Sequence, residues 1–457
     1  MTPSLHLTTL VLVGVGSPLV LFAVLGGASL LNRPLPERWT AGLAAVAMGI
    51  ACATLTVALM VHGTIGAGTR LLSYGALSAS HEGGIAIEFL VDRLSLAFAA
   101  LSAAIAGVVS AFSNRYLHRE PGYNRYFVLL ALFVAGMLLV ALAGNVTVLF
   151  VGWEFVGLSS ALLVAFFHDR PAAVSNALRV FSVYRISDAA MLSAAVLLRH
   201  IAGTDSLSLL FGGAAGASTA ALSGPTATII AVLLIVAVAC KSALLPFSSW
   251  LPRAMEGPTP SSAVYYGSLS IHAGCFLLLR SAPLLEQAPF ARLLAAGAGG
   301  ATAVFAGITT RVQSDVKSSL AYASLTQVGI IVVEIALGWY TIAFLHLAGH
   351  ACFRLLQFLS APNVLHDLHA IEDAIGDRPS PDAGHLGVVM PPLLRRRLFL
   401  IALERGFLDG ILDRVVVEPF MRVARLLTRF DQWLCLPRRS RAAAKPGRLE
   451  EDGDRDE

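Results

Sequence analysis

The sequence predicts an all-α polytopic membrane protein of about eleven transmembrane helices, with the N-terminus outside and the C-terminus inside. Hydrophobic residues make up 56% of the 457 residues, charged residues only 14%, and the mean hydropathy is +0.72. Soluble domains carry about 25% charged residues, so these values nearly exclude a soluble enzyme. Span-length apolar runs recur along the chain, and Arg and Lys are concentrated in alternate connecting segments.

Eleven apolar runs have the roughly 20 residues that a membrane span requires. If the N-terminus lies outside, ten basic residues flank the odd-numbered, cytoplasmic loops and five flank the even-numbered ones, which favours this count and orientation. The last run could be broken rather than continuous. The runs lie at 8–31, 40–62, 94–113, 127–144, 146–167, 177–199, 227–250, 262–283, 292–310, 318–337 and 339–360.

The remaining segments divide the chain into three parts. Residues 1–361 form the predicted membrane domain, with a short external hairpin expected in 63–93 and a Gly/Ala/Ser-rich external linker in 203–226. Residues 362–436 form a predicted cytoplasmic helical tail for partner docking, in which 394–435 is amphipathic and is expected to kink at Pro419. Residues 437–457 are charged and predicted to be disordered.

The bulk chemistry excludes several function classes. A net charge of +4 gives no indication of nucleic-acid binding, and the sequence contains no Walker loop or dinucleotide fingerprint. The five cysteines form no CxxC pair, so we interpret them as small hydrophobic residues. We therefore predict no metal site and no cofactor on this chain.

Ionisable residues inside apolar runs are functional candidates because a charge at bilayer depth is costly. Glu154 lies in the middle of VLFVGWEFVGLSSALLVAFF, although a neutral buried carboxyl is the structural alternative. Arg185 and Asp188 are three residues apart on one helical face. They either neutralise each other or tune the neighbouring Glu154.

Lys241 is notable because the chain has thirty arginines and only three lysines. It ends the run ATIIAVLLIVAVACK, and Pro246 follows, so the helix is expected to break just after Lys241. Broken helices at depth usually line a cavity. Lysine, unlike arginine, can lose its proton when buried, so Lys241 is a candidate proton carrier. The alternative is a lysine that reaches the membrane boundary.

Several histidines share the predicted depth of these charges. His346, His350 and Arg354 recur every four residues on one face, and His272 lies in another run. Histidine suits a proton relay, whereas structural histidines, or a metal pair without a clear third ligand, are the alternatives. Glu334 is either part of this set or interfacial. Together these groups indicate an ion-translocating subunit.

Five consecutive motifs resemble the antiporter-like proton-translocating subunits of respiratory complex I and of Mrp-type cation antiporters. The motifs are GWEFVGLSSALLVAFF, RVFSVYRISDAAML, KSALLPFSSWLPRAMEGPTPSSA, VQSDVKSSLAYASLTQVG and HLAGHACFRLLQFL. The resemblance implies a half-channel in which an acidic neighbour switches the protonation of a lysine. It assigns proton transfer to the matching residues Glu154, Asp188, Lys241, Lys317, His346 and His350.

The chain also departs from this pattern. Tyr266 stands where complex I subunits often have histidine, and His272 follows six residues later. Arg354 replaces a lysine that often follows the paired histidines, and arginine cannot release a proton. The second half-channel of full-length antiporter subunits is not found after the eleventh run.

Other stretches are most similar to the DabB family, the membrane subunits of DAB inorganic-carbon accumulation complexes. These include AMEGPTPSSAVYYGSLSIHAG, SLTQVGIIVVEIALG and the tail RRRLFLIALERGFLDGILDRVVVEPF. The resemblance implies a bacterial inner-membrane subunit bound to a DabA-like zinc protein with carbonic-anhydrase-like chemistry, with zinc on that partner. Cation flow through this chain would then power conversion of CO2 to bicarbonate.

Three hypotheses follow: a proton-conducting subunit of such a complex, a subunit of a complex I-like or Mrp-like assembly, and a passive scaffold. A scaffold needs no deprotonatable lysine beside a helix break, which disfavours the third.

Overall fold

A computed structural model describes residues 3–65, 68–76, 86–211, 224–313, 315–375 and 392–435. Within these ranges, eleven helices are long and apolar enough to cross a membrane, which confirms the predicted all-α polytopic fold. The predicted C-terminal disordered segment, 437–457, lies outside the described residues.

The helices in chain order are α1 (Pro3–Leu30), α2 (Glu37–Ile65), α3 (Arg93–Tyr116), α4 (Tyr123–Leu142), α5 (Val146–Val164), η1 (Ala165–Phe167), α6 (Pro171–Ala202), α7 (Leu207–Phe211), α8 (Gly224–Lys241), α9 (Trp250–Arg253), η2 (Ala254–Glu256), α10 (Thr259–Ser261), η3 (Ser262–Ser268), α11 (Ser270–Arg280), α12 (Ala282–Glu286), α13 (Pro289–Thr309), η4 (Thr310–Val312), α14 (Val316–Leu337), α15 (Tyr340–Ile375), α17 (Pro392–Leu403), η5 (Arg405–Phe407), α18 (Leu408–Leu412), η6 (Asp413–Val417) and α19 (Glu418–Cys435).

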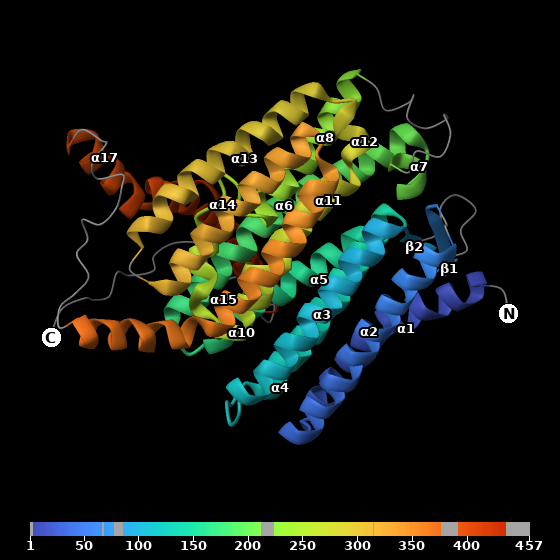
Figure 1. Ribbon diagram of the computed structural model, residues 1–457, viewed down its shortest axis with the longest axis horizontal. Coiled ribbons are helices and arrows are strands. Elements are labelled where there is room, and N and C mark those ends of the chain that lie inside the picture. The colour runs from blue at the N-terminus through green and yellow to red at the C-terminus, as the bar shows by residue number, and fades with distance from the viewer. Residues whose placement is uncertain are drawn as a thin grey trace.

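A two-stranded antiparallel hairpin marks one end of the bundle, as the alternating sequence predicted. Its strands are β1 (Arg70–Ala76) and β2 (Ala86–Val91), and α3 begins directly after β2 with Asp92 as its N-cap. Figure 1 places this hairpin beside α7, away from α17. We call this end the hairpin end, and the opposite end, where α18 packs, the tail end.

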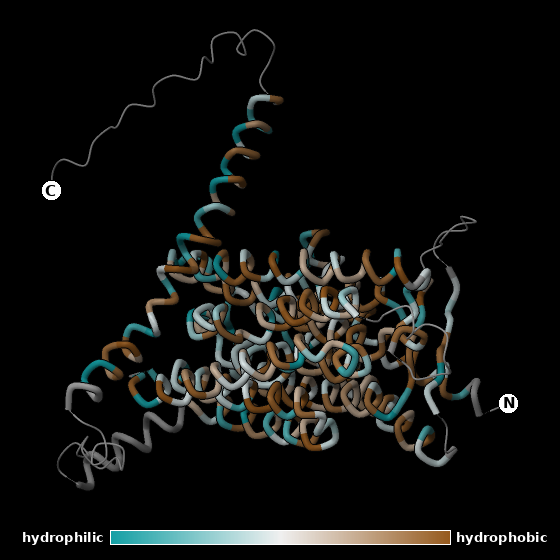
Figure 2. Tube along the Cα trace, turned by 90° about the horizontal axis from the view of Figure 1, so that it is seen from above, coloured by the Kyte–Doolittle hydropathy of each residue, from teal (hydrophilic) through white to brown (hydrophobic). Residues whose placement is uncertain are grey.

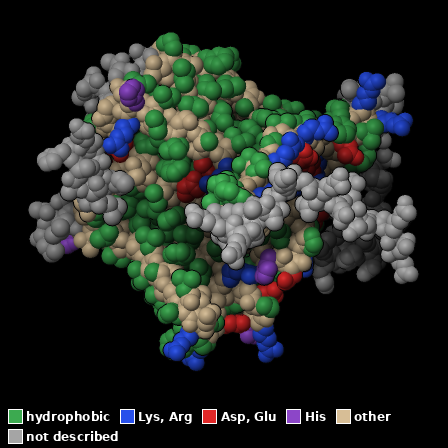
Figure 3. Space-filling view, turned by 180° about the vertical axis from the view of Figure 1, so that it is seen from behind, with side chains coloured by type: hydrophobic (Ala, Val, Ile, Leu, Met, Phe, Trp, Pro, Cys, Tyr) green, Lys and Arg blue, Asp and Glu red, His purple; other side chains and the backbone are tan. Residues whose placement is uncertain are grey.

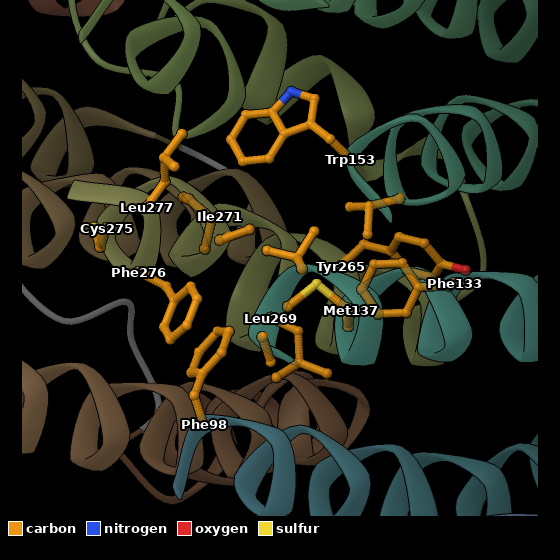
Figure 4. Packing of buried hydrophobic residues seen from close by; sticks show 14 of the residues in the cluster. Phe98, Phe133, Met137, Trp153, Tyr265, Leu269, Ile271, Cys275, Phe276 and Leu277 are labelled. Atoms are coloured by element: carbon orange, nitrogen blue, oxygen red, sulfur yellow. The ribbon is translucent and has the colours of Figure 1, made fainter. Parts of the chain in front are cut away.

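Two groups of helices pack along one continuous core. Helices α1 to α4 pack on one another, and α4 joins them to α5, α6, α8, α11, α13, α14 and α15 (Figure 1). Aromatic residues fill the junction, where Phe98 stacks on Phe276 and Phe133 contacts Tyr265 (Figure 4). The face drawn in Figure 3 carries broad areas of apolar side chains with small groups of charges between them, as expected for a lipid-facing protein.

The seventh span breaks where the sequence predicted. Helix α8 ends at Lys241, irregular chain follows through Pro246, and α9 begins only at Trp250. The freed backbone groups have partners: the Trp250 indole donates to the Cys240 carbonyl at 2.9 Å, and Thr302 accepts from the Leu245 amide at 2.9 Å. Protein groups therefore satisfy this non-helical backbone at depth.

The eleventh run is continuous, because α15 extends from Tyr340 to Ile375. It thus passes the predicted domain boundary at residue 361. The tail is not one helix: Arg405, Gly406 and Phe407 all have positive φ and separate α17 from α18. A side chain at Gly406 would place its Cβ 2.9 Å from Phe305, so glycine suits both the turn and the packing.

The tail beyond this turn is strongly amphipathic. The turn before Pro419 is π-helical rather than a sharp kink, and α19 continues from it. Figure 2 shows α19 projecting from the bundle with polar and apolar residues alternating along it. Several of its large apolar side chains, including Leu427 and Phe430, are more than half exposed.

Candidate proton-transfer site

Lys241 lies at the centre of the bundle, fully buried at the end of α8. Its Nζ donates a hydrogen bond to the Trp153 carbonyl at 3.1 Å and lies 5.0 Å from the Trp153 ring centre and 4.3 Å from that of Tyr184. Among the described residues, no carboxylate lies within ion-pair distance of it. The ammonium is thus held by a carbonyl and two aromatic faces, an arrangement that tolerates either protonation state.

Hydrogen bonds tie the three helices around this lysine together. The Trp153 indole on α5 donates to Ser187 on α6 at 3.1 Å. Ser187 in turn donates to the Ala237 carbonyl, one turn before Lys241 on α8, at 2.8 Å. Gly157 permits the approach, because a Cβ there would lie 3.1 Å from Nζ.

Glu154 and Asp188 share one arginine. The Arg185 guanidinium lies 2.9 Å from a Glu154 oxygen and 2.7 Å from an Asp188 oxygen. The structure therefore joins the two predicted groups, Glu154 and the Arg185–Asp188 pair, into one cluster. Glu154 follows Trp153, which contacts Lys241, and Asp188 follows Ser187, which accepts a hydrogen bond from the Trp153 indole.

His272, His350 and Arg354 form a buried hydrogen-bonded chain with a fixed direction. His272 Nδ1 lies 2.7 Å from the Ser268 carbonyl, so it must donate its proton there. Its Nε2 then accepts from His350 Nδ1 at 2.9 Å, and His350 Nε2 accepts from Arg354 Nε at 3.1 Å. Both rings are neutral in this arrangement.

His346 belongs to a second histidine cluster, one turn from His350. Its Nδ1 lies 3.0 and 3.1 Å from the two Glu334 oxygens, and its Nε2 lies 3.0 Å from the Gln327 side-chain oxygen. The Glu334 carboxylate is thus a partner of the histidine and not a lone interfacial acid.

Two predicted residues, Lys317 and Tyr266, lie apart from the contacts of Lys241 and from the histidines. The Lys317 Nζ donates to the Gly257 carbonyl at 3.3 Å and lines a polar cavity of 460 Å³ at the tail end, together with Glu256 and Arg405. Tyr266 is buried and donates to the Ser160 carbonyl at 3.1 Å. Neither contacts the Lys241 ammonium.

Sequence reasoning missed several participants. Trp153 could have been found because it adjoins Glu154 in the GWE motif, but no local signal singled out Tyr184 or Gln327. It also missed the ion pairs that fasten the tail, Arg179–Asp413 at 2.5 Å and Arg253–Asp409 at 2.6 Å. Ion pairs between residues more than 150 positions apart cannot be recognised from the spacing of residues along the sequence.

No three His, Cys, Asp or Glu side chains in the described part of the chain are placed to hold a metal ion.

Comparison with known families agrees with this geometry. The model described as "NADH:quinone oxidoreductase/Mrp antiporter, TM" matches residues 143–391, more than half of the chain. The chain belongs to this family. The model of the complex I chain 5 N-terminus matches residues 79–127 of the same antiporter-like chain.

Curated relatives are longer than this antiporter-like chain. The NADH-quinone oxidoreductase subunit L of Mycobacterium tuberculosis is 36% identical over 295 residues, which are 64% of this chain and 46% of the relative. The NAD(P)H-quinone oxidoreductase chain 5 of Synechocystis is 32% identical over 303 residues, 66% of this chain and 44% of the relative. The match thus spans less than half of the length of each.

Solved structures have the same fold. A chain of the Mrp complex from Dietzia sp. DQ12-45-1b matches 87% of this chain and 40% of its own length, with a TM-score of 0.63 and 28% identity. A chain of an archaeal membrane-bound sulfane sulfur reductase matches 76% of this chain and 55% of its own, with a TM-score of 0.63. At 22% identity the latter similarity shows the fold alone.

Proposed function

We propose that this antiporter-like chain is a proton-conducting membrane subunit of a heteromeric complex. The observation that carries the proposal is Lys241, a buried lysine held by Trp153 and Tyr184 with no described acid within ion-pair distance. An ammonium buried without an ion-pair partner is costly, so the energy of its protonated form depends on where the neighbouring charges lie.

Arg185 is the natural switch in this scheme. It bridges Glu154 and Asp188, so a shift of the guanidinium toward one carboxylate leaves the other without its cation. The released negative charge would favour a proton on Lys241, and restoring the bridge would favour its loss. The histidine pair on α11 and α15 would then receive the proton.

The assembly is the second part of the proposal. Relatives in complex I-like and Mrp-type complexes favour a subunit of an assembly of that kind, embedded in a bacterial inner membrane. The tail supports a heteromer, because two ion pairs fix α18 and η6 to the bundle while α19 presents an exposed apolar face.

A second candidate is the energising subunit of an inorganic-carbon complex with a DabA-like zinc partner. The specific observation that favours it is the similarity of the segment around Tyr266 and of the tail to DabB-type sequences. Here proton flow through the same site would drive CO2 hydration on the partner.

Glu154→Gln tests the shared proposal. The variant keeps the size of the side chain but removes the charge that Arg185 binds. We expect proton flux across vesicles that contain the full complex to be lost, while the co-purifying subunits remain bound. Wild-type flux in Glu154→Gln would refute the proposed role.

Deleting 394–435 tests the docking role of the tail. Loss of the co-purifying subunits is expected, and recovery of an intact complex would refute it. A zinc-containing partner in the wild-type complex would select the second candidate, and quinone-oxidoreductase subunits would select the first.

A further inference from the structure

We infer that Glu334 and His346 form the terminal station of the proton path in this chain, where protons exchange with water at the hairpin end. The inference rests on the proposed proton-conducting function and assigns the outlet that the family motifs leave open. It starts from Arg354, at the far end of the buried histidine chain.

Arg354 blocks continuation of the relay along α15. Its Nε–H donates to His350 Nε2, and its Nη1 donates to Gln357 at 2.5 Å. A guanidinium keeps its protons and has no lone pair to accept another, so no proton passes through it. The only atom at which the His272–His350 pair can exchange a proton on this side is therefore His350 Nε2.

A cavity connects that atom to the second cluster. It has a volume of 320 Å³ and is lined by Gln327, His346, Gly349, His350 and Arg354. The two histidine rings are 6.4 Å apart, centre to centre. When Arg354 turns aside, a proton can move between His350 and His346 across this space.

The second cluster is built to hold one mobile proton. Both ring nitrogens of His346 face side-chain oxygens, of Glu334 and Gln327, an arrangement that suits a ring with a proton on each nitrogen. Transfer breaks the His346 Nδ1–H bond and forms an O–H bond on Glu334. The pair is electrically neutral before and after this step, which lowers the cost of placing it near lipid.

The position of the pair suits an outlet. Glu334 is one turn from the end of α14 at the hairpin end, whereas Lys317 lies at the other end of the same helix, about 25 Å away at 1.5 Å per residue. The side chains of His346 and Glu334 are 26% and 14% exposed, while the whole of His272 is inaccessible. The carboxyl can therefore release its proton to water at the hairpin end.

Proton flux into vesicles that contain the full complex provides the first test. Because removing a proton-transfer group typically costs 10²–10⁴ in rate, Glu334→Gln is expected to lower the flux about 100-fold. Glu334→Asp should keep a substantial part of it. Glu286→Gln is the matched control. It removes an exposed carboxylate at the same end, which accepts a hydrogen bond from Tyr340 and has no place in the proposed proton path, so the flux should not change.

Cysteine labelling provides a test that does not depend on flux. In a cysteine-free background, a membrane-impermeant charged thiol reagent should label Glu334→Cys. It should leave Leu293→Cys unlabelled, because we expect this apolar position, four residues from the hairpin end of α13 and 71% exposed, to face lipid.

The outcomes separate the two proposals. No flux in the wild-type complex refutes the proposed function, whereas the labelling result still decides whether water reaches Glu334. Wild-type flux in Glu334→Gln, with flux lost in Lys241→Met, overturns the outlet alone. Equal labelling of the two cysteine variants also overturns it.

Discussion

Replacing Lys241 with methionine should abolish proton conduction while changing stability little. Methionine has similar length and fills the same space between Trp153 and Tyr184, so no cavity forms. The variant loses one charged hydrogen bond worth about 1.5–3 kcal/mol and cation–π contacts worth about 2 kcal/mol. The variant also avoids the desolvation cost of a fully buried ammonium, which is on the order of several kcal/mol and so comparable to the interactions it loses.

The opposing terms nearly cancel, so the free energy of unfolding should change by no more than about 2 kcal/mol. Proton flux should fall at least about 100-fold, because a thioether carries no proton. Thermal unfolding in detergent and dye-reported flux in vesicles measure the two effects. Lys445→Met, in the C-terminal segment outside the described residues, is the control. Full flux in Lys241→Met would show that the ammonium is not a proton carrier. Strong destabilisation would show that the opposing free-energy terms do not cancel.

Three further perturbations follow from the same contacts. Gly157→Ala places a methyl carbon 3.1 Å from the Lys241 Nζ, a contact tight enough to displace the ammonium, so flux should slow several-fold without loss of folding; unchanged flux would mean that the ammonium is elsewhere during transfer. Burial raises the pKa of Asp92, but hydrogen bonds from Arg280 and the charge of its guanidinium outweigh this and hold the pKa below its ordinary value. A depressed pKa stabilises the fold above the unfolded pKa, near 4, and this stability is lost as the pH falls through the lower folded value. The melting temperature of the wild type should therefore fall more steeply below about pH 4 than that of Asp92→Asn; parallel profiles would exclude this contribution. Asp413→Asn removes one of the two ion pairs of the tail, so limited proteolysis should cut α19 faster, and an unchanged rate would show that the pair does not hold the tail.

Much of the candidate site was visible in the sequence because burial of charge is costly wherever it occurs. Glu154, Asp188 and Lys241 stood out as ionisable residues in apolar runs, and the structure brings them together around α5, α6 and α8. The break after Lys241 was predictable because proline removes a helical hydrogen bond regardless of tertiary context. Lys317 also belongs to one of the family motifs but lies at the tail end. A sequence motif does not show how deep in the membrane its residues lie, so this position could not be predicted.

The tail illustrates the opposite case. Its amphipathic periodicity predicted helix, but not the turn at Arg405, Gly406 and Phe407 that separates α17 from α18. The turn follows from packing of Gly406 against Phe305 and from the ion pairs of Asp409 and Asp413 with distant arginines. None of these contacts is local in sequence.

The sequence by itself determined the class of the protein, the approximate spans and the identity of the buried charges. Each of these depends on the hydropathy of one segment and on the free-energy cost of placing a charge in lipid. The tertiary structure alone decided the partners. It placed an aromatic pair instead of an acid against Lys241, one arginine between two carboxylates, and Glu334 against His346. Partnership depends on how helices pack, and packing brings together side chains whose separation along the chain says nothing about their distance in space.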